Sequence, residues 1–378
     1  MEFSFTVKGH ENILGTHDAT LEFTKDTELT KRGNCIIGVD ADFDSSSIQD
    51  FIKTNKKRKI LVEISSGKEQ DSFVCFINSS FKSNSQLVFR KSDFISERTF
   101  GINAAKSSLE LDRKLMESIK ASGAEITLKP IKHKCIIFDF DNTLEEFENS
   151  KSKGELAVAK EISKKYGHDE KEVKKLLENV DNEFTTKGLE KKDITLYDRI
   201  KWYHEYAKRN KIDIPESEIK KLVKIYWETI NKEITAISGA HELLTSLKKA
   251  GYILAMLTDS DGAKKIKTDR IEKLRLEKYF ELIVTGDDTQ TTKPDEKNLK
   301  YLLDQLNKNR KDDDLIKFEE CISIGDKPPA DLMPCKPLGI TTIWFKYGRW
   351  KTIITEKPQY VDFEAKKLAE AGRIIEQL

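Results

Sequence analysis

Four groups of polar residues in the second half of the chain have side chains suited to acid–base chemistry and to holding charge. They are Asp139 with Asp141, Thr258 with Asp259, Lys293, and Asp326 with Asp331. Each group lies at, or soon after, the end of a short apolar run. A carboxylate can act as a nucleophile, as a general acid or base, or as a ligand for a hard cation. A lysine can supply a fixed positive charge beside them.

The apolar runs indicate the elements that must position these groups. We expect strands at Cys135–Asp139, Tyr252–Thr258, Leu282–Thr285, Cys321–Ile324 and Thr341–Phe345. Helical patterns separate the runs, which is typical of an α/β fold with a doubly wound parallel sheet. Ligand sites of such sheets form outside the carboxyl ends of the strands, so the four groups should converge in space.

Together the four groups resemble the four motifs of the haloacid dehalogenase (HAD) superfamily, whose members are mostly phosphatases. The resemblance rests on Asp139-Phe140-Asp141-Asn142-Thr143-Leu144, Thr258, Lys293-Pro294, and Gly325-Asp326 with Asp331. It covers about residues 132–348. A Lys/Glu-rich helical segment at about 154–232 is too long for an ordinary crossover and resembles the helical cap of phosphoglycolate-phosphatase-like members. The resemblance therefore implies a Rossmann-like fold with an α-helical cap inserted at about 150–235.

The resemblance also implies an activity, that of a phosphatase hydrolysing a small phosphomonoester. Asp139 would attack phosphorus and form an aspartyl-phosphate, and Asp141 would act as general acid and base. Lys293 would hold a positive charge beside the phosphoryl group. Thr258 and Asp259 would lie at the phosphate oxygens, although Asp259 stands where many relatives have Asn.

A magnesium ion is the cofactor that the resemblance implies. Two carboxylates and a phosphate dianion can gather only with cations, and Mg²⁺ prefers hard oxygen ligands. The implied ligands are the Asp139 carboxylate, the Asp141 backbone carbonyl and Asp326. Asp331 would ligate through water or hold the other ligands, and Thr143 would brace the nucleophile loop.

Several alternatives stay open within this superfamily. Asp141 favours phosphoryl transfer, because the dehalogenase members lack an aspartate there. A phosphonate hydrolase or a mutase variant is not excluded, since the cap has many lysines. Phosphoglycolate, a triose or sugar phosphate, a nucleotide and a phospho-amino acid are all candidate substrates. Some cap residues could face the site or could simply pack or lie in solvent, namely Lys187, Arg199, Trp202, Tyr203 and Tyr206.

Residues 1–130 show the short apolar runs that are typical of a β-rich domain. Strands are expected at Met1–Val7, Ala19–Thr24, Asn34–Val39, Lys59–Ile64, Ser72–Ile77 and Gln86–Phe89, with one helix at about Ser107–Ser122. This pattern indicates a small sandwich or barrel with one helix. Segments such as Gly33–Val39 and Arg98–Ala104 resemble an archaeal domain family of unassigned function. We expect domains at 1–130 and 131–378, joined by a short link near Ala124–Lys134.

Two features of the first domain could carry a further role. His10, His17, Asp40 and Asp42 could form a metal or ligand site, although loop capping explains them more simply. The basic run Lys56–Lys59 could contact RNA, although no aromatic stacking pattern surrounds it. An RNA- or protein-binding module fused to an accessory hydrolase domain is therefore the alternative to a two-domain phosphatase.

Composition limits the expected partners and setting. Lys and Arg number 66 and Asp and Glu 65, so the net charge of +1 gives little support for nucleic-acid binding. The five cysteines lack CxxC spacing, which favours reduced thiols in a cytoplasm. No apolar run approaches the length of a membrane span. We expect a cytoplasmic monomer or homodimer whose partner is a small phosphorylated metabolite rather than a membrane or nucleic acid.

Overall fold

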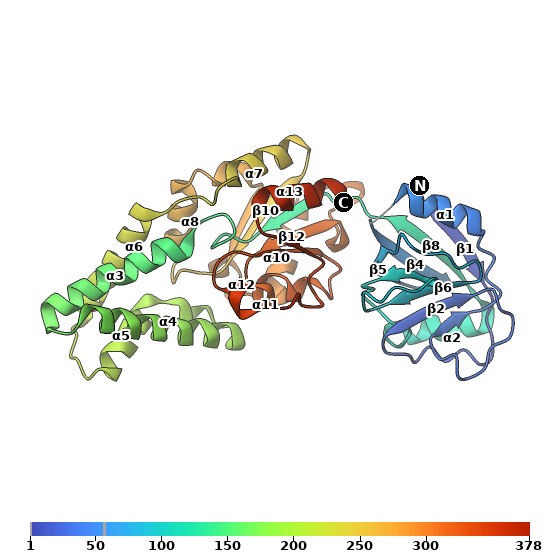
Figure 1. Ribbon diagram of the computed structural model, residues 1–378, viewed down its shortest axis with the longest axis horizontal. Helices are drawn as coiled ribbons and strands as arrows, with labels where there is room; N and C mark the ends of the chain where they lie inside the picture. The colour runs from blue at the N-terminus through green and yellow to red at the C-terminus, as the bar shows by residue number, and fades with distance from the viewer. Residues whose placement is uncertain (1, 56–57) are drawn as a thin grey trace. The chain divides into compact units, whose positions relative to one another are not determined.

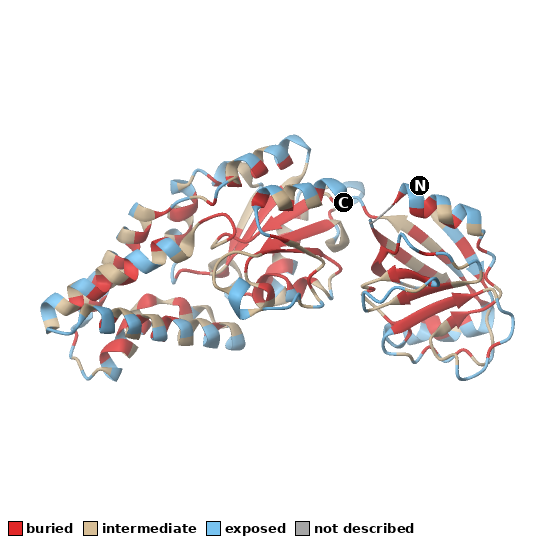
Figure 2. Cartoon of the chain, in the orientation of Figure 1, coloured by how far each residue is buried: buried red, intermediate tan, exposed pale blue. Residues whose placement is uncertain are grey.

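A computed structural model of the chain describes residues 2–55 and 58–378 (Figure 1). The chain divides into two compact units. The first is Met1–His133 with Ile374–Leu378, and the second is Lys134–Arg373. In both units the strands are mostly buried, while the helices keep exposed outer faces (Figure 2).

The first unit is built on a mixed sheet that has eight strands in the described residues. Their spatial order is β1 (Phe3–Val7), β8 (Ala124–Pro130), β4 (Lys59–Ser66), β5 (Glu69–Ile77), β7 (Thr99–Ile102), β6 (Gln86–Arg90), β2 (Thr20–Thr24) and β3 (Ile36–Gly38). Lys8 and Val39, just beyond the two edge strands, exchange backbone hydrogen bonds of 2.7 and 3.1 Å. The sheet therefore curls toward a closed barrel, and phenylalanine rings packed edge to face fill its interior.

The predicted β-rich character of this unit is confirmed, but its helices differ in detail. The expected helix at 107–122 is a 3₁₀ turn at Ser108–Glu110 followed by α2 (Arg113–Ser122). Asp112 caps α2 by accepting hydrogen bonds from the first-turn amides. A further helix, α1 (Ser45–Thr54), was not expected. The strand β8 occupies most of the predicted link, so the connection between the units is shorter than 124–134.

The second unit contains a parallel sheet of six strands in the described residues. Their order is β11 (Leu282–Thr285), β10 (Ile253–Thr258), β9 (Cys135–Phe138), β12 (Cys321–Gly325), β13 (Thr341–Phe345) and β14 (Phe363–Ala365). The doubly wound fold is confirmed, and the five expected strands match within a residue at each end. The middle strands consist mainly of buried apolar residues because helices cover both faces.

Helices cover the sheet on both sides (Figure 1). On one side lie α7 (Ala240–Lys249) and α13 (Leu368–Gln377), and on the other lie α10 (Glu296–Asn307) and α11 (Pro328–Asp331). Three more helices flank the strand ends, namely α8 (Lys264–Lys273), α9 (Gly286–Thr289) and α12 (Trp350–Ile353). Short 3₁₀ turns occur at Glu277–Tyr279, Asp312–Asp314, Phe318–Glu320 and Met333–Cys335.

The inserted cap is a bundle of helices with its own hydrophobic core. It consists of α3 (Phe147–Tyr166), α4 (Glu170–Lys191), a 3₁₀ turn at Ile194–Tyr197, α5 (Arg199–Arg209) and α6 (Glu216–Glu233). The first cap helix begins a few residues before the predicted insertion. Gly154 lets α3 approach α6 closely, because a Cβ there would lie only 3.0 Å from the Tyr226 ring. This close packing holds the cap together as one body.

The alternative metal site of the first unit is not assembled. The Nδ1 atoms of His10 and His17 each accept a backbone N–H two residues on, while Asp40 pairs with Lys8. Asp42 accepts hydrogen bonds from the backbone and hydroxyl of Thr6. These side chains therefore serve local structure.

Three further features discussed from the sequence are the basic run, the cysteines and the apolar segments. Of the basic run, Lys56 and Lys57 lie outside the described residues, and Lys59 is buried with its ammonium 5.5 Å from the ring centre of Phe76. None of the five cysteines, all of which lie within the described residues, forms a disulfide bond. In the part of the chain that the structure describes, no helix is both long and apolar enough to cross a membrane.

Candidate active site

The carboxyl ends of the central strands bring the predicted polar groups together. Asp139 follows β9, Asp326 follows β12, and Asp331 ends the short helix α11. One carboxylate oxygen from each lies within 4.8 Å of the others, and all three residues are buried. The topology thus gathers three negative charges, far apart in sequence, at one edge of the sheet.

Lys293 lies between two of these carboxylates. Its Nζ is 2.5 Å from Asp139 Oδ1 and 2.6 Å from Asp331 Oδ1. Burial opposes the charge on Lys293, but these two carboxylates outweigh it and raise its pKa well above the usual value. The lysine therefore stays protonated and fixes the position of Asp139.

Thr143 connects the loops after β9 and β12. Its hydroxyl donates to Asp139 Oδ2 at 2.9 Å and accepts the backbone N–H of Asp326 at 3.1 Å. Each oxygen of the Asp139 carboxylate therefore has a hydrogen-bond donor. Burial nevertheless raises the pKa of Asp139 to about 7 against the effect of Lys293, with Asp331 also raising it.

Asp326 carries the signature of a cation site. Its Oδ2 is buried and has no hydrogen-bond partner among the described residues. Burial, with Asp139 and Asp331, raises the pKa of Asp326 well above its usual value. The three carboxylates outnumber the two nearby ammonium groups, those of Lys293 and Lys327, so the donor set fits a divalent cation that prefers oxygen ligands.

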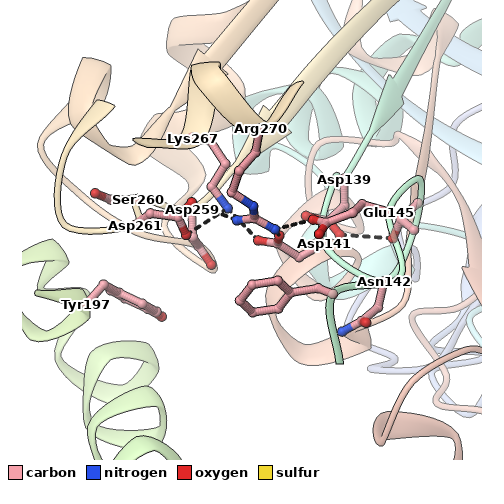
Figure 3. Close-up of polar contacts among 12 residues, drawn as sticks. Asp139, Asp141, Asn142, Glu145, Tyr197, Asp259, Ser260, Asp261, Lys267 and Arg270 are labelled. Carbon is pink, nitrogen blue, oxygen red and sulfur yellow. Dashed lines mark hydrogen bonds and ion pairs between the residues drawn. The ribbon is translucent and has the colours of Figure 1, made fainter. Parts of the chain in front are cut away.

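Asp141 is held by two cations from α8 (Figure 3). Lys267 Nζ lies 2.5 Å from Asp141 Oδ2, and Arg270 Nη2 lies 2.5 Å from Asp141 Oδ1. Arg270 also contacts Asp261 at 2.7 Å and forms a short ion pair with Glu145. Burial would raise the pKa of Asp141, but Arg270 and Lys267 outweigh it and hold the pKa well below its usual range.

The sequence analysis missed Lys267 and Arg270, which are both fully buried. A polar helix such as α8 gives no sign of burial by itself. The available signal is their spacing of three residues, which places both on one face of a helix soon after Thr258.

Thr258 ends β10, and Asp259 follows it directly. Thr258 is buried, and its hydroxyl has no hydrogen-bond partner among the described residues. Asp259 Oδ1 accepts the hydroxyl of Thr292 at 2.5 Å and the backbone N–H of Lys293 at 2.9 Å. The Asp259 side chain thus orients the lysine loop.

A cavity of about 130 Å³ joins this end of the sheet to the cap. Pockets for drug-sized ligands span roughly 300–1,000 Å³, so this one suits a small molecule. Arg199 and Trp202 line it from the cap. Of the other cap candidates, Tyr203 and Tyr206 are buried in the cap core and Lys187 forms an ion pair near solvent.

The parallel sheet, the helical cap and the convergent polar groups define a capped hydrolase. Residues 136–345 match the family described as haloacid dehalogenase-like hydrolase, and the chain belongs to that family. Residues 5–132 match a domain of unknown function, DUF371. The two resemblances drawn from the sequence are therefore confirmed.

Three known proteins show how far the likeness extends. An uncharacterized protein of Methanocaldococcus jannaschii is 38% identical over 138 residues, or 35% of this chain and 99% of that protein. A glyceraldehyde 3-phosphate phosphatase of Pyrococcus furiosus is 30% identical over 152 residues, or 40% of this chain and only 59% of that relative. The magnesium-bound HAD-hydrolase YfnB of Bacillus subtilis has a TM-score of 0.51 at 16% identity, covering 65% of this chain and 99% of its own. This last match supports the fold.

Proposed function

We propose that the second unit is a magnesium-dependent phosphatase that hydrolyses a small phosphomonoester through an aspartyl-phosphate on Asp139. The observation that carries the proposal is the meeting of Asp139, Lys293, Asp326 and Asp331 at one end of the cavity. The similarity to a glyceraldehyde 3-phosphate phosphatase and the small cavity support a small substrate.

In the first half-reaction, Asp139 attacks phosphorus and the bond to the leaving oxygen breaks. Asp141 gives that oxygen a proton, an effect worth about 10²–10⁴-fold in rate. Asp141 is ionised and ion-paired with Lys267 and Arg270, so it must exchange one of these partners for the leaving group and take up a proton from water before it can act as the acid. In the second half-reaction, Asp141 takes a proton from water, water attacks phosphorus, and phosphate leaves Asp139 free.

Charge neutralisation supplies the rest of the catalysis. Lys293 offsets the charge of Asp139, and the free hydroxyl of Thr258 can donate to a phosphate oxygen. The residues that would hold Mg²⁺ are Asp139, Asp326 and the Asp141 carbonyl, with Asp331 directly or through water. The ion would neutralise charge on the phosphoryl oxygens.

A cap lysine, Lys151, lines the cavity and bears on the phosphonate alternative. Burial lowers its pKa, which would help a lysine that attacks a carbonyl. Lys151 is, however, ion-paired with both Asp181 and Glu155, so it is not free to react. We therefore favour phosphomonoester hydrolysis over phosphonate cleavage. The expected oligomeric state, a monomer or homodimer, stays a prediction.

The test is hydrolysis of para-nitrophenyl phosphate and a panel of metabolite phosphates with Mg²⁺. Asp139→Asn should abolish phosphate release while circular dichroism and thermal unfolding stay close to those of the parent. Asp304→Asn, at an exposed position in α10, is the matched control and should retain full activity. A parent protein inactive on every substrate with Mg²⁺ would contradict the proposal.

A further inference from the structure

We propose that the cap end of the cavity binds a second anionic group of the substrate through Arg199, so that the substrate is a short phosphorylated hydroxy acid. This inference rests on the proposed phosphatase function and names its substrate class. The observation behind it is a buried guanidinium that lines the cavity without a carboxylate partner.

Arg199 is the first residue of α5 and is 6% exposed. Within residues 2–55 and 58–378, its guanidinium forms no ion pair. Nη1 donates to the carbonyl of Tyr197 at 3.1 Å, Nη2 makes a long contact of 3.4 Å with the Tyr226 hydroxyl, and Nε has no partner. Nε is therefore an unused donor, and Nη2 makes only this one long contact.

Several other cations at or near the cavity are ion-paired, whereas Lys327 and Arg349, which line it but are only partly buried, form no ion pair among the described residues. Lys151 pairs with Asp181 and Glu155 in the cap. Lys267 and Arg270 pair with Asp141, and Lys293 pairs with Asp139. Pairing of this kind is the usual condition for burying a charge, since an unpaired buried charge is strongly unfavourable.

Trp202 orients the Arg199 guanidinium without neutralising it. The guanidinium carbon lies 3.4 Å from the centre of the Trp202 ring, so the two groups are in close contact. Such stacking offsets part of the cost of burial, but it leaves the in-plane N–H groups free. A stacked guanidinium that lacks a carboxylate partner and keeps unused N–H donors is suited to binding a carboxylate.

The two ends of the cavity then specify a substrate with two anionic groups. The phosphoryl group would lie at Lys293 and Thr258, and the carboxylate at Arg199. A cavity of about 130 Å³ favours a short carbon chain between them. A neutral aldehyde or alcohol of the same size would leave Arg199 unpaired and would bind less tightly.

The experiment compares matched substrates that differ at the carboxylate. We expect kcat/KM for 3-phosphoglycerate to exceed that for glycerol 3-phosphate and glyceraldehyde 3-phosphate by about 10- to 100-fold, mainly through KM. Arg199→Gln should bring this ratio close to one. Arg199→Lys should keep part of the preference, because it retains the charge but not the planar fork. Arg209→Gln is the control, since Arg209 is a half-exposed arginine of α5 with two carboxylate partners and should keep the full preference.

A binding measurement provides a readout that does not depend on turnover. In the Asp139→Asn background, 3-phosphoglycerate should raise the unfolding temperature, and adding Arg199→Gln should remove that shift. Arg199→Gln should leave the unfolding temperature of the ligand-free protein equal or higher, because an unpaired buried charge is removed. A large fall for both Arg199→Gln and Arg199→Lys would identify a structural arginine and overturn the inference.

The outcomes separate this inference from the function on which it rests. If the protein hydrolyses para-nitrophenyl phosphate but does not prefer 3-phosphoglycerate, the proposed anion site at Arg199 is wrong, while the proposed phosphatase function is retained. A preference for the acid that survives Arg199→Gln would also overturn it. If no phosphate ester is hydrolysed, the phosphatase itself fails.

Discussion

Removing Arg270 is the most severe test of the ion-pair network beneath Asp141. The side chain is fully buried, with Nη1 2.7 Å from Asp261, Nη2 2.5 Å from Asp141, and a further contact with Glu145. Arg270→Met leaves these three carboxylates with Lys267, which contacts only Asp141 and Asp261. Breaking a buried ion pair costs about 3–5 kcal/mol.

The expected loss lies near the lower end of this range. Burial raises the pKa of Glu145 to about 8 in spite of Arg270, so this carboxyl can take up a proton when its partner is lost. We therefore expect the free energy of unfolding of the second unit to fall by about 3 kcal/mol at pH 7. Because Asp141 would also lose its orientation, kcat should fall by at least about 100-fold.

Urea unfolding followed by circular dichroism measures the first quantity, and phosphate release measures the second. Lys273→Met is the matched control, because Lys273 is exposed on the same helix, and its effect should stay within about 0.5 kcal/mol. If Arg270→Met cost less than about 1 kcal/mol and left kcat within a few fold, the network would not position Asp141 and the reasoning would be refuted.

Four further changes test other parts of the chain. Thr143→Val removes the hydroxyl between Asp139 and the Asp326 amide, so kcat should fall by about 10- to 100-fold at nearly constant KM, measured by steady-state kinetics. Asp326→Asn should raise the Mg²⁺ concentration for half-maximal activity by at least about tenfold in a metal titration. The pKa of Glu145 is raised from 4.5 to about 8, so its stabilising contribution is full below pH 4.5 and is lost as the pH rises through 8. Glu145→Gln should flatten that fall in urea titrations between pH 5 and 8. Burial lowers the pKa of His133 from 6.5 to about 3, so its contribution is present above pH 6.5 and is lost as the pH falls toward 3. His133→Gln should weaken that acid sensitivity of the first unit in thermal scans.

The sheet of the second unit could be predicted because strands buried on both faces can be recognised in the sequence by their apolar residues. A parallel strand covered on both faces must be apolar throughout, so Cys135–Phe138 and its neighbours stand out from polar surroundings. The edge strand β14 could not be recognised in this way, because it has three residues, one of them charged, and is only partly buried. The helix α1 begins with three serines, and only its Asp44 cap and three buried apolar side chains mark it as a helix.

Some site residues could likewise be predicted from the local sequence, whereas others depend on tertiary packing. Asp139, Thr258 and Asp326 could be found because each lies directly at a strand end, where the topology of the fold fixes its place. Lys267 and Arg270 could not, because a lysine or arginine on a polar helix is by default a solvated residue. Only the packing of α8 against the loop after β9 turns these two side chains inward.

The separation of charge along the cavity follows from these same contacts and bears on both proposals. At the sheet end, the carboxylates of Asp139, Asp326 and Asp331 outnumber the nearby ammonium groups of Lys293 and Lys327, so a cation would complete the neutralisation of that end. At the cap end, Arg199 has positive charge and no carboxylate partner among the described residues. A phosphate ester without a second anion could satisfy only the first end, even with Mg²⁺ present. A phosphorylated acid together with Mg²⁺ would satisfy both ends, and for that reason the two proposals are best tested with one matched set of substrates.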